Sequence, residues 1–323
     1  MSSTRVAVVD CGTNTIRLLV ADVTAEGVVT DVIPRRATIV RLGQGIDETG
    51  EFAPEALERT FAATREYAAT IAEVGGVERV RFIATSASRD AGNRDEFFSG
   101  IASILGVVPE VISGTREAAL AFRGAVSEVR SAWPGPYCVV DLGGGSTELV
   151  VGTDTPVASF SMNVGSVRLT ERCITGDPPS EEERRAVEDA VRTALDEAAA
   201  TVPLGTVKTI VGLAGTITTL TGYSLGLHTY DREKVNGASF DVEQVEADAL
   251  AMFSMSRQER LDLGFMQPGR ADVIGAGAIV WREVVARVAS EVTRAGGGAP
   301  VVVTSEHDIL DGLAAALGEV GRL

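Results

Sequence analysis

The sequence predicts an α/β protein built as two similar halves. Strand-like and helix-like runs alternate along the whole chain, which is the pattern of sheets covered by helices. Two stretches repeat each other, VVDCGTNTIRLLV from Val8 and VVDLGGGSTELVV from Val139, with their aspartates 131 residues apart (141 minus 10). A chain of 323 residues, of which 45% are hydrophobic, is long enough for two cores.

In the first half, apolar spacing predicts strands that precede helices. A proline start and apolar residues at helical spacing indicate a helix from Pro54 to about Val74. Strands are expected over Val6–Asp10, Ile16–Val23, Val28–Ile33 and TIVRLGQGID, the last ending at Gly43. RVRFIATSASRD is interpreted as a strand entering a polar loop, followed by a helix around Asp95–Leu105, a strand in VPEVISG and a helix in TREAALAFRGAV.

The strand–turn–strand pattern begins again at Cys138, after the Pro/Gly segment RSAWPGPY, which is the best linker candidate. Ser180 and Glu183 form a capping-box signature that starts a charged helix. The remaining elements are expected as a strand, turn and helix in VKTIVGLAGTITTL, a long apolar helix in ADVIGAGAIVWREVVARVA, and a final strand and helix after GGGAP. The predicted domains are 1–124, joined by a C-terminal helix over about 306–323, and 125–305.

Composition narrows the function classes. A net charge of −16 argues against nucleic-acid binding. No run of 18 apolar residues occurs, so no membrane span is expected, and the N-terminus has no signal-peptide pattern. The three cysteines (Cys11, Cys138 and Cys173) lack metal-site spacing. We therefore expect a cytoplasmic protein.

The repeated turn has the residues of an anion site. Consecutive glycines expose successive N–H groups that bind anions, and small hydroxyls beside them add donors. The candidate phosphate-binding residues in the two turns are Gly12, Thr13, Asn14, Thr15, Gly143, Gly144, Gly145, Ser146 and Thr147. The alternative is an ordinary hairpin turn in which Asp and Gly serve geometry alone. No Walker motif and no G-x-G-x-x-G fingerprint is present.

Asp10 and Asp141 end the strands that enter the two turns. Carboxylates in this position can hold a metal directly or through water, and Mg²⁺ prefers one or two carboxylates together with phosphate oxygens. The sequence therefore predicts that Asp10 and Asp141 bind Mg²⁺ or Mn²⁺. His228 and His307 lie far apart in the sequence, so catalysis or metal binding by histidine is not expected.

Nine segments in order resemble the exopolyphosphatase / guanosine pentaphosphate phosphohydrolase family, within the actin-like ATPase superfamily. They are DCGTNTIRLLV, VRLGQGID, ATSASRDAGN, VISGTREAALAFRG, VVDLGGGSTELVV, NVGSVRLTE, GLAGTITTL, PGRADVIGAG and SEHDILDGL. The resemblance implies two ribonuclease-H-like domains with an active-site cleft between them, and a last helix that packs on the first domain. The chain resembles the short, two-domain members of the family. A homodimer is expected from the family resemblance alone.

The resemblance also assigns roles. Glu117 matches the family's catalytic glutamate, and its place in the first turn of a predicted helix favours an ionised carboxylate. Glu148 matches a position near the metal and water and is the second catalytic candidate. Arg89 matches the phosphate-binding arginine, and Arg41 is a weaker candidate for the same role. Arg116 stands where many relatives have an acidic residue, so it either acts on Glu117 or points to solvent.

Arg17 and Arg168 are further, weaker candidates, because strand and helix surfaces commonly carry arginine. Gly212, Gly215 and Thr216 resemble the segment that contacts a nucleotide in superfamily kinases, and here would border the phosphate channel.

The leading hypothesis is a metal-dependent exopolyphosphatase that hydrolyses inorganic polyphosphate. Hydrolysis of guanosine pentaphosphate to the tetraphosphate, part of the stringent response, is the alternative, since both substrates present the same terminal anhydride. A sensor that binds polyphosphate or an alarmone without turnover is a third reading, and the four carboxylates near the phosphates argue against it. A kinase is a fourth reading, for which no acceptor signature is found.

Overall fold

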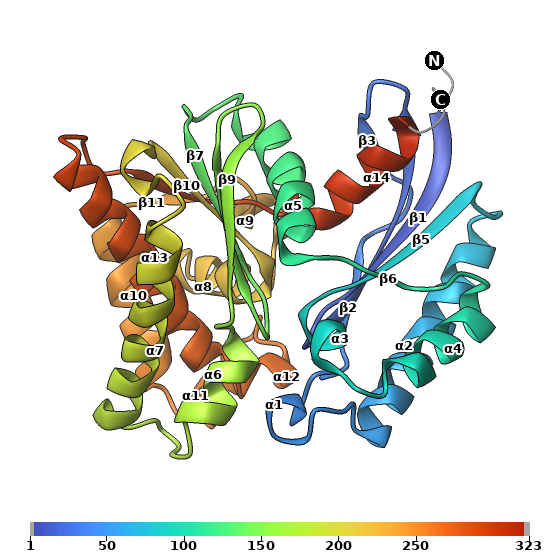
Figure 1. Cartoon of the computed structure of the whole chain (residues 1–323), viewed down its shortest axis with the longest axis horizontal. Coiled ribbons are helices and arrows are strands. Elements are labelled where there is room, and N and C mark those ends of the chain that lie inside the picture. The colour runs from blue at the N-terminus through green and yellow to red at the C-terminus, as the bar shows by residue number, and fades with distance from the viewer. Residues whose placement is uncertain (1–2, 320–323) are drawn as a thin grey trace. The chain divides into compact units, whose positions relative to one another are not determined.

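The computed structural model describes residues 3–319 and divides them into two compact units. Unit 1 comprises residues 3–120 and 309–319, and unit 2 comprises residues 121–308. The division falls inside helix α5 (Gly114–Val129), whereas the sequence placed it at 124/125. The Pro/Gly segment RSAWPGPY lies within unit 2 and joins α5 to the first strand of that unit (Figure 1).

Unit 1 contains a mixed sheet with strand order β3-β2-β1-β5-β6, in which β4 also pairs with β2. Strands β1 and β2 are antiparallel, and β5 and β6 continue the sheet in parallel with β1. The strands are β1 (Ser3–Cys11), β2 (Thr15–Thr24), β3 (Val29–Asp31), β4 (Arg36–Ile39), β5 (Arg79–Ala84) and β6 (Glu110–Val111).

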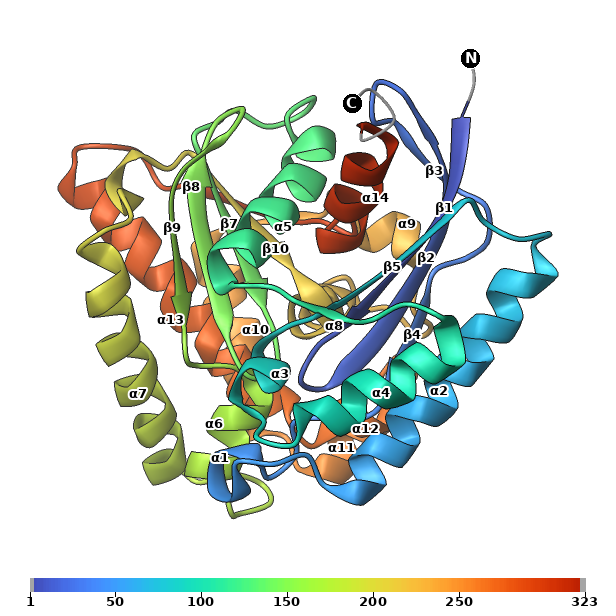
Figure 2. The same cartoon turned by 45° about the vertical axis from the view of Figure 1, so that its right-hand side comes forward.

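Helices cover both faces of this sheet. They are α1 (Ile46–Thr49), α2 (Pro54–Glu73), α3 (Ser86–Asp90), α4 (Arg94–Leu105), the first part of α5, and α14 (Ile309–Glu319). Alternate residues of β1, from Ala7 to Cys11, share a core with α2 and α4. Helix α14 packs on β1 and β2 from the opposite face (Figure 2). Arg35 secures it by ion pairs to Asp31 and Asp311.

Unit 2 repeats this arrangement, with strand order β9-β8-β7-β10-β12-β11. Again a three-stranded antiparallel meander leads to parallel strands, since β10 runs parallel to both β7 and β12. The strands are β7 (Tyr137–Leu142), β8 (Thr147–Gly152), β9 (Pro156–Met162), β10 (Thr209–Leu213), β11 (Ser239–Phe240) and β12 (Val301–Thr304). The repeat seen in the sequence is therefore a repeat of sheet topology.

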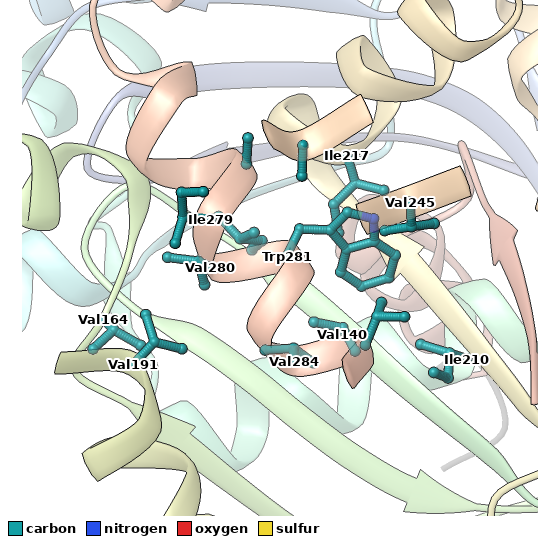
Figure 3. Close-up of a cluster of buried hydrophobic side chains, with 14 of the residues drawn as sticks. Val140, Val164, Val191, Ile210, Ile217, Val245, Ile279, Val280, Trp281 and Val284 are labelled. Carbon is teal, nitrogen blue, oxygen red and sulfur yellow. The ribbon is translucent and has the colours of Figure 1, made fainter. Parts of the chain in front are cut away.

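The large core of unit 2 forms between this sheet and α13. Trp281 of α13 lies among apolar side chains that include Val140, Ile217 and Val245 (Figure 3). The helices are α6 (Ser166–Cys173), α7 (Glu181–Ala199), α8 (Ala214–Ser224), α9 (Arg232–Val235), α10 (Val242–Ser254), α11 (Arg257–Leu261), α12 (Pro268–Ala271) and α13 (Ile274–Arg294), with a 3₁₀ turn at Leu204–Thr206. The capping box of Ser180 and Glu183 is present at α7.

Two local expectations were wrong, and one further strand is shorter than expected. Strand β4 ends at Ile39 rather than Gly43, because its pairing with β2 stops there and Arg41 adopts a left-handed φ of 52°. The polar loop expected in TSASRD is the short helix α3, whose N-terminal residues lie buried. The strand expected in VPEVISG is only two residues long, since it pairs with β5 alone.

Within residues 3–319, the helices are too short or too polar to cross a membrane.

Candidate functional site

The two repeated turns have the same backbone construction. In unit 1, Gly12 N donates to Thr15 O over 3.0 Å, and in unit 2 Gly143 N donates to Ser146 O over 3.0 Å. Each turn joins the first two antiparallel strands of its sheet. Each lies at the carboxyl end of a strand that has a parallel neighbour, which is where open α/β sheets bind ligands.

Helix α6 fixes the glycine turn of unit 2 through the turn's carbonyl groups. Ser166 N donates to Gly143 O over 3.0 Å, and Val167 N donates to Gly144 O over 2.9 Å. In a trans peptide the N–H points away from the carbonyl, so the N–H groups of Gly144 and Gly145 face away from α6. No described residue accepts a hydrogen bond from either group. The turn therefore presents the two consecutive donors that an anion nest requires.

Gly165, immediately before α6, makes this arrangement possible. A Cβ atom at this position would lie 2.5 Å from Gly144 O. Any side chain there would push the helix away from the turn. This role of Gly165 was not predicted from the sequence, in which the only signal is a glycine directly before the start of a helix.

The turn of unit 1 is held by a different segment in an equivalent way. Gly43 N donates to Thr13 O and Arg41 N donates to Asn14 O, each over 2.9 Å. The backbone N–H groups of Thr13 and Asn14 have no acceptor among residues 3–319. Arg41, which makes one of these hydrogen bonds, has a left-handed φ of 52°. Non-glycine residues with such a strained backbone are concentrated at functional sites.

A row of polar residues crosses three strands of unit 2. In the register of the sheet, Asp141 of β7 is paired with Glu148 of β8, which is paired with Ser161 of β9. Asp141 is 8% exposed and Glu148 only 1%. Hydroxyl groups of Ser146 and Ser161 both donate to Glu148 Oε1, over 2.8 and 2.7 Å. The two predicted carboxylates are thus neighbours at the edge of the turn.

The corresponding row in unit 1 has a cation in place of the second carboxylate. Asp10 of β1 is paired in register with Arg17 of β2. Arg17 donates from Nε and Nη2 to Asp10 Oδ2, over 3.1 and 2.6 Å. Arg17 and Glu148 both follow their aspartates by seven residues (17 minus 10 and 148 minus 141). The two halves of the repeat are therefore alike in backbone and different in charge.

Arg89 and Glu117 form an ion pair in unit 1. Arg89 Nη1 donates to Glu117 Oε2 and to the backbone oxygen of Ile112, each over 2.9 Å. Arg89 comes from α3, which follows β5, and Glu117 from the first turn of α5. The Glu117 residue is only 7% exposed. The neighbouring Arg116 instead pairs with Glu110 over 3.0 Å at the surface, so its side chain points away from this pair.

The start of α3 lies beside the turn of unit 1. Thr85 N donates to Cys11 O over 3.2 Å, and a Cβ atom on Gly12 would lie 3.8 Å from Thr85 Oγ1. Unit 1 thus brings its turn close to the segment that carries Arg89. Burial and the neighbouring Asp10 raise the pKa of Cys11 well above its usual range, so this thiol is not a nucleophile.

Strand β10 of unit 2 leads directly into α8 through a strained residue. Ala214 has a φ of 71°, and a Cβ atom on Gly215 would lie 2.3 Å from Arg270 Nη2. Arg270 Nη1 also donates to Thr219 Oγ1 over 2.7 Å. The guanidinium of Arg270 therefore contacts the backbone at Gly215, in the GLAGT segment predicted to border the phosphate channel.

The usual pattern of a metal site is a cluster of His, Cys, Asp or Glu side chains. Among residues 3–319, no three His, Cys, Asp or Glu side chains come together as a metal site. The His307 backbone is bound to the Ser305 hydroxyl in the loop before α14, and the His228 backbone oxygen lies against Gly264. Burial raises the pKa of Cys138 to about 12. The candidate functional groups in each unit are therefore its turn and the carboxylates and arginines beside that turn.

Known proteins are similar to this chain in sequence and in structure. A sequence model of the Ppx/GppA phosphatase family matches residues 19–299. Exopolyphosphatase 2 of Mycobacterium tuberculosis is 47% identical over 325 residues, which cover 98% of this chain and 99% of the relative. A crystal structure of an exopolyphosphatase-like protein superposes with a TM-score of 0.96 at 46% identity, covering 100% of both chains. A Ppx/GppA member from Aquifex aeolicus gives a TM-score of 0.79 at 30% identity, covering 99% of each chain.

Proposed function

Because this chain belongs to the Ppx/GppA phosphatase family, we propose that it is an exopolyphosphatase, a hydrolase that releases terminal orthophosphate from inorganic polyphosphate. One observation carries the proposal: each unit has a turn of the same construction whose N–H groups have no acceptor in the described chain. A polyphosphate chain carries a row of anionic oxygens, and each turn offers a set of backbone N–H donors that could bind such oxygens. The relative from M. tuberculosis, named an exopolyphosphatase, supports this assignment.

Arg89 is proposed to bind a phosphate while it holds Glu117. A guanidinium has five N–H donors, of which Nη1 supplies two. Both donors of Nη1 are used, by Glu117 and by the backbone oxygen of Ile112. In the described part of the chain, Nε and Nη2 have no acceptor. These remaining donors can fork onto two phosphate oxygens, which is the geometry that arginine favours.

Glu117 is proposed as the base that takes a proton from the attacking water, and Glu148 as the second carboxylate at the reacting phosphate. The ion pair with Arg89 favours the charged form of Glu117 that a base requires. Donation from two serine hydroxyls stabilises a charged Glu148 in its buried position.

A divalent cation, Mg²⁺ or Mn²⁺, is proposed as the cofactor, with Asp141 and Asp10 as its protein ligands. The residues of unit 2 fit a magnesium site, since Asp141 lies one residue before the end of β7, next to the turn, and is paired in register with Glu148. Asp10 of unit 1 fits a direct metal ligand less well, because its carboxylate is already ion-paired with Arg17. Asn14 Oδ1 is a buried acceptor with no donor among residues 3–319, which suits a metal-bound water. Such a cation would neutralise charge on the phosphate oxygens.

Guanosine pentaphosphate is the alternative substrate, since it carries the same terminal anhydride and a relative from Pseudoalteromonas atlantica, 34% identical over 60% of this chain, is named a guanosine-5'-triphosphate,3'-diphosphate pyrophosphatase. Hydrolysis of this nucleotide would place the protein in the stringent response. We also propose a cytoplasmic location, from the composition of the sequence, and a homodimer, from the family resemblance.

The decisive experiment measures phosphate release by the purified chain with Mg²⁺. Long-chain polyphosphate and guanosine pentaphosphate are compared for the wild type, Glu117→Gln and Glu128→Gln. Glu128 lies on the same helix α5 but is exposed, so it is the matched control. We expect rapid release from polyphosphate, a loss of about 10²- to 10⁴-fold in Glu117→Gln, and no change in Glu128→Gln.

Release from the nucleotide alone would replace the proposal by its alternative. Tight binding of polyphosphate without any release would instead make the protein a sensor.

A further inference from the structure

Glu148 is held by hydroxyl groups from two separate elements. Ser146 belongs to the turn itself, whereas Ser161 comes from the neighbouring strand β9. Both hydroxyls donate to the same oxygen, Oε1, over 2.8 and 2.7 Å. Two donors on one oxygen fix the plane of the carboxylate as well as its position, because rotation about the last side-chain bond would break both hydrogen bonds.

We propose that Ser161 is a positioning residue that orients the Glu148 carboxylate for phosphoanhydride hydrolysis, an inference that rests on the proposed function. Ser161 is anchored independently of the turn, since β9 pairs with β8 in continuous register from Thr147 to Val151. Ser146, by contrast, belongs to the turn proposed to bind phosphate. Ser161 therefore supplies the hydrogen bond that keeps Glu148 aligned with Asp141 during turnover.

The repeat provides an internal comparison for this proposal. At the equivalent place in unit 1, the strand β4 presents Ala37 opposite Arg17. A hydroxyl there would have no carboxylate to orient, because Arg17 is itself fixed by its ion pair with Asp10. The hydroxyl on the third strand thus accompanies the carboxylate and is missing where the carboxylate is replaced by a cation.

Loss of the hydrogen bond from Ser161 should matter for Glu148 because its carboxylate is buried. Glu148 is 1% exposed, so water cannot readily replace a lost donor. A buried carboxylate needs hydrogen bonds to stay in one orientation. Without Ser161 Oγ, Glu148 would keep only one of its two serine donors, Ser146. Misorientation of a reacting group affects turnover more than substrate binding.

The test compares Ser161→Ala, Ser161→Thr and Ser159→Ala in the full chain. Ser159 lies two residues away on the same strand and the same face, and no hydrogen bond of its side chain is found among residues 3–319, so it is the matched control. For each variant, kcat and KM for polyphosphate are measured at saturating Mg²⁺, together with Tm. We expect Ser161→Ala to lose about tenfold to a hundredfold in kcat with KM changed by less than about twofold.

Threonine keeps the hydroxyl and suits a strand, so Ser161→Thr should retain at least about a third of the wild-type kcat. Ser159→Ala should match the wild type. If Ser161→Ala unfolds, Ser161→Cys takes its place, because a thiol keeps the volume but donates weakly.

An unchanged kcat in the alanine or cysteine variant would overturn the inference, as would an equal loss in Ser161→Thr. A lower Tm with unchanged kcat would assign Ser161 a structural role only. A wild-type protein that releases no phosphate would overturn the proposed function itself, which separates the two failures.

Discussion

Arg89 Nη1 lies 2.9 Å from Glu117 Oε2, so the predicted phosphate ligand and the predicted base of unit 1 are ion-paired. The Arg89 side chain is 25% exposed and that of Glu117 is 10% exposed. One guanidinium can therefore connect the base to the substrate. This relationship makes the two residues interdependent, and neither role can be tested without regard to the other.

Substitution of Arg89 by lysine should separate charge from geometry. Lysine keeps the positive charge but cannot fork between Glu117, the Ile112 backbone and a phosphate. We expect kcat/KM for polyphosphate to fall about a hundredfold, which steady-state kinetics would measure. Arg116→Lys is the control, because Arg116 pairs with Glu110 at the surface, and it should change kcat/KM by less than about twofold. Equal effects of the two substitutions would contradict this role of Arg89.

Removal of the proposed metal should abolish activity reversibly. We expect a chelator to stop phosphate release and added Mg²⁺ or Mn²⁺ to restore it. Asp141→Asn should raise the Mg²⁺ concentration for half-maximal activity by about tenfold or more, because it removes a charged ligand. Asp154→Asn is the control, since its side chain is 83% exposed on a hairpin. An unshifted Mg²⁺ titration of Asp141→Asn would exclude Asp141 as a metal ligand.

Gly165→Ala should disturb the glycine turn without touching a catalytic side chain. The added Cβ would lie 2.5 Å from Gly144 O, so α6 must move and its hydrogen bonds to the turn must weaken. We expect kcat/KM to fall by about tenfold to a hundredfold and the free energy of unfolding by about 1–3 kcal/mol. Gly298→Ala should have neither effect, because a Cβ there would meet nothing within 4 Å. Normal kinetics in Gly165→Ala would show that the turn does not need α6.

Acid stability should depend on Glu183, the capping-box residue of α7. Backbone hydrogen bonds from Ser180, Thr175 and Gly176 lower the pKa of Glu183 to about 2. A carboxylate with a lowered pKa stabilises the fold above its unfolded pKa of about 4.5, and this contribution is lost as the pH falls towards 2. Solvent screening reduces the contribution to about 1 kcal/mol.

The measurement is Tm between pH 6 and pH 3 for the wild type, Glu183→Gln and the exposed control Glu182→Gln. The advantage of the wild type over Glu183→Gln should shrink as the pH falls, whereas Glu182→Gln should follow the wild type. A constant difference between wild type and Glu183→Gln would refute the linkage.

The repeat and the capping box could be predicted because their signals are local. VVDCG and VVDLG each place an aspartate before a turn, and both are strand–turn–strand units in the structure. Ser180 and Glu183 are three residues apart, and both of their reciprocal hydrogen bonds form. Helix α2 begins at Pro54 as its proline start indicated, and it ends within one residue of the expected position.

Features that depend on contacts distant in sequence were not predicted. Ser161 reaches Glu148 only through the register of β8 with β9, and Gly165 matters only because α6 folds back onto the turn. The left-handed Ala214 reflects the abrupt passage from β10 to α8, whereas its residue type favours an ordinary helix. The ion pair of Arg17 with Asp10 is the exception, because it is local; it was missed because the length of the turn, which sets this pairing, was not fixed by the sequence.

The place of α14 in unit 1 has a consequence for how the protein is made. Its buried residues, among them Ile309 and Leu313, cover β1 and β2, yet they follow the whole of unit 2 in the chain. A ribosome therefore delivers residues 121–308 before the helix that completes the first sheet. Until then, one apolar face of β1 and β2 lacks this cover, and such a face is where chaperones act and where nascent chains aggregate. The core of unit 1 is therefore completed only after all of unit 2 has been synthesised.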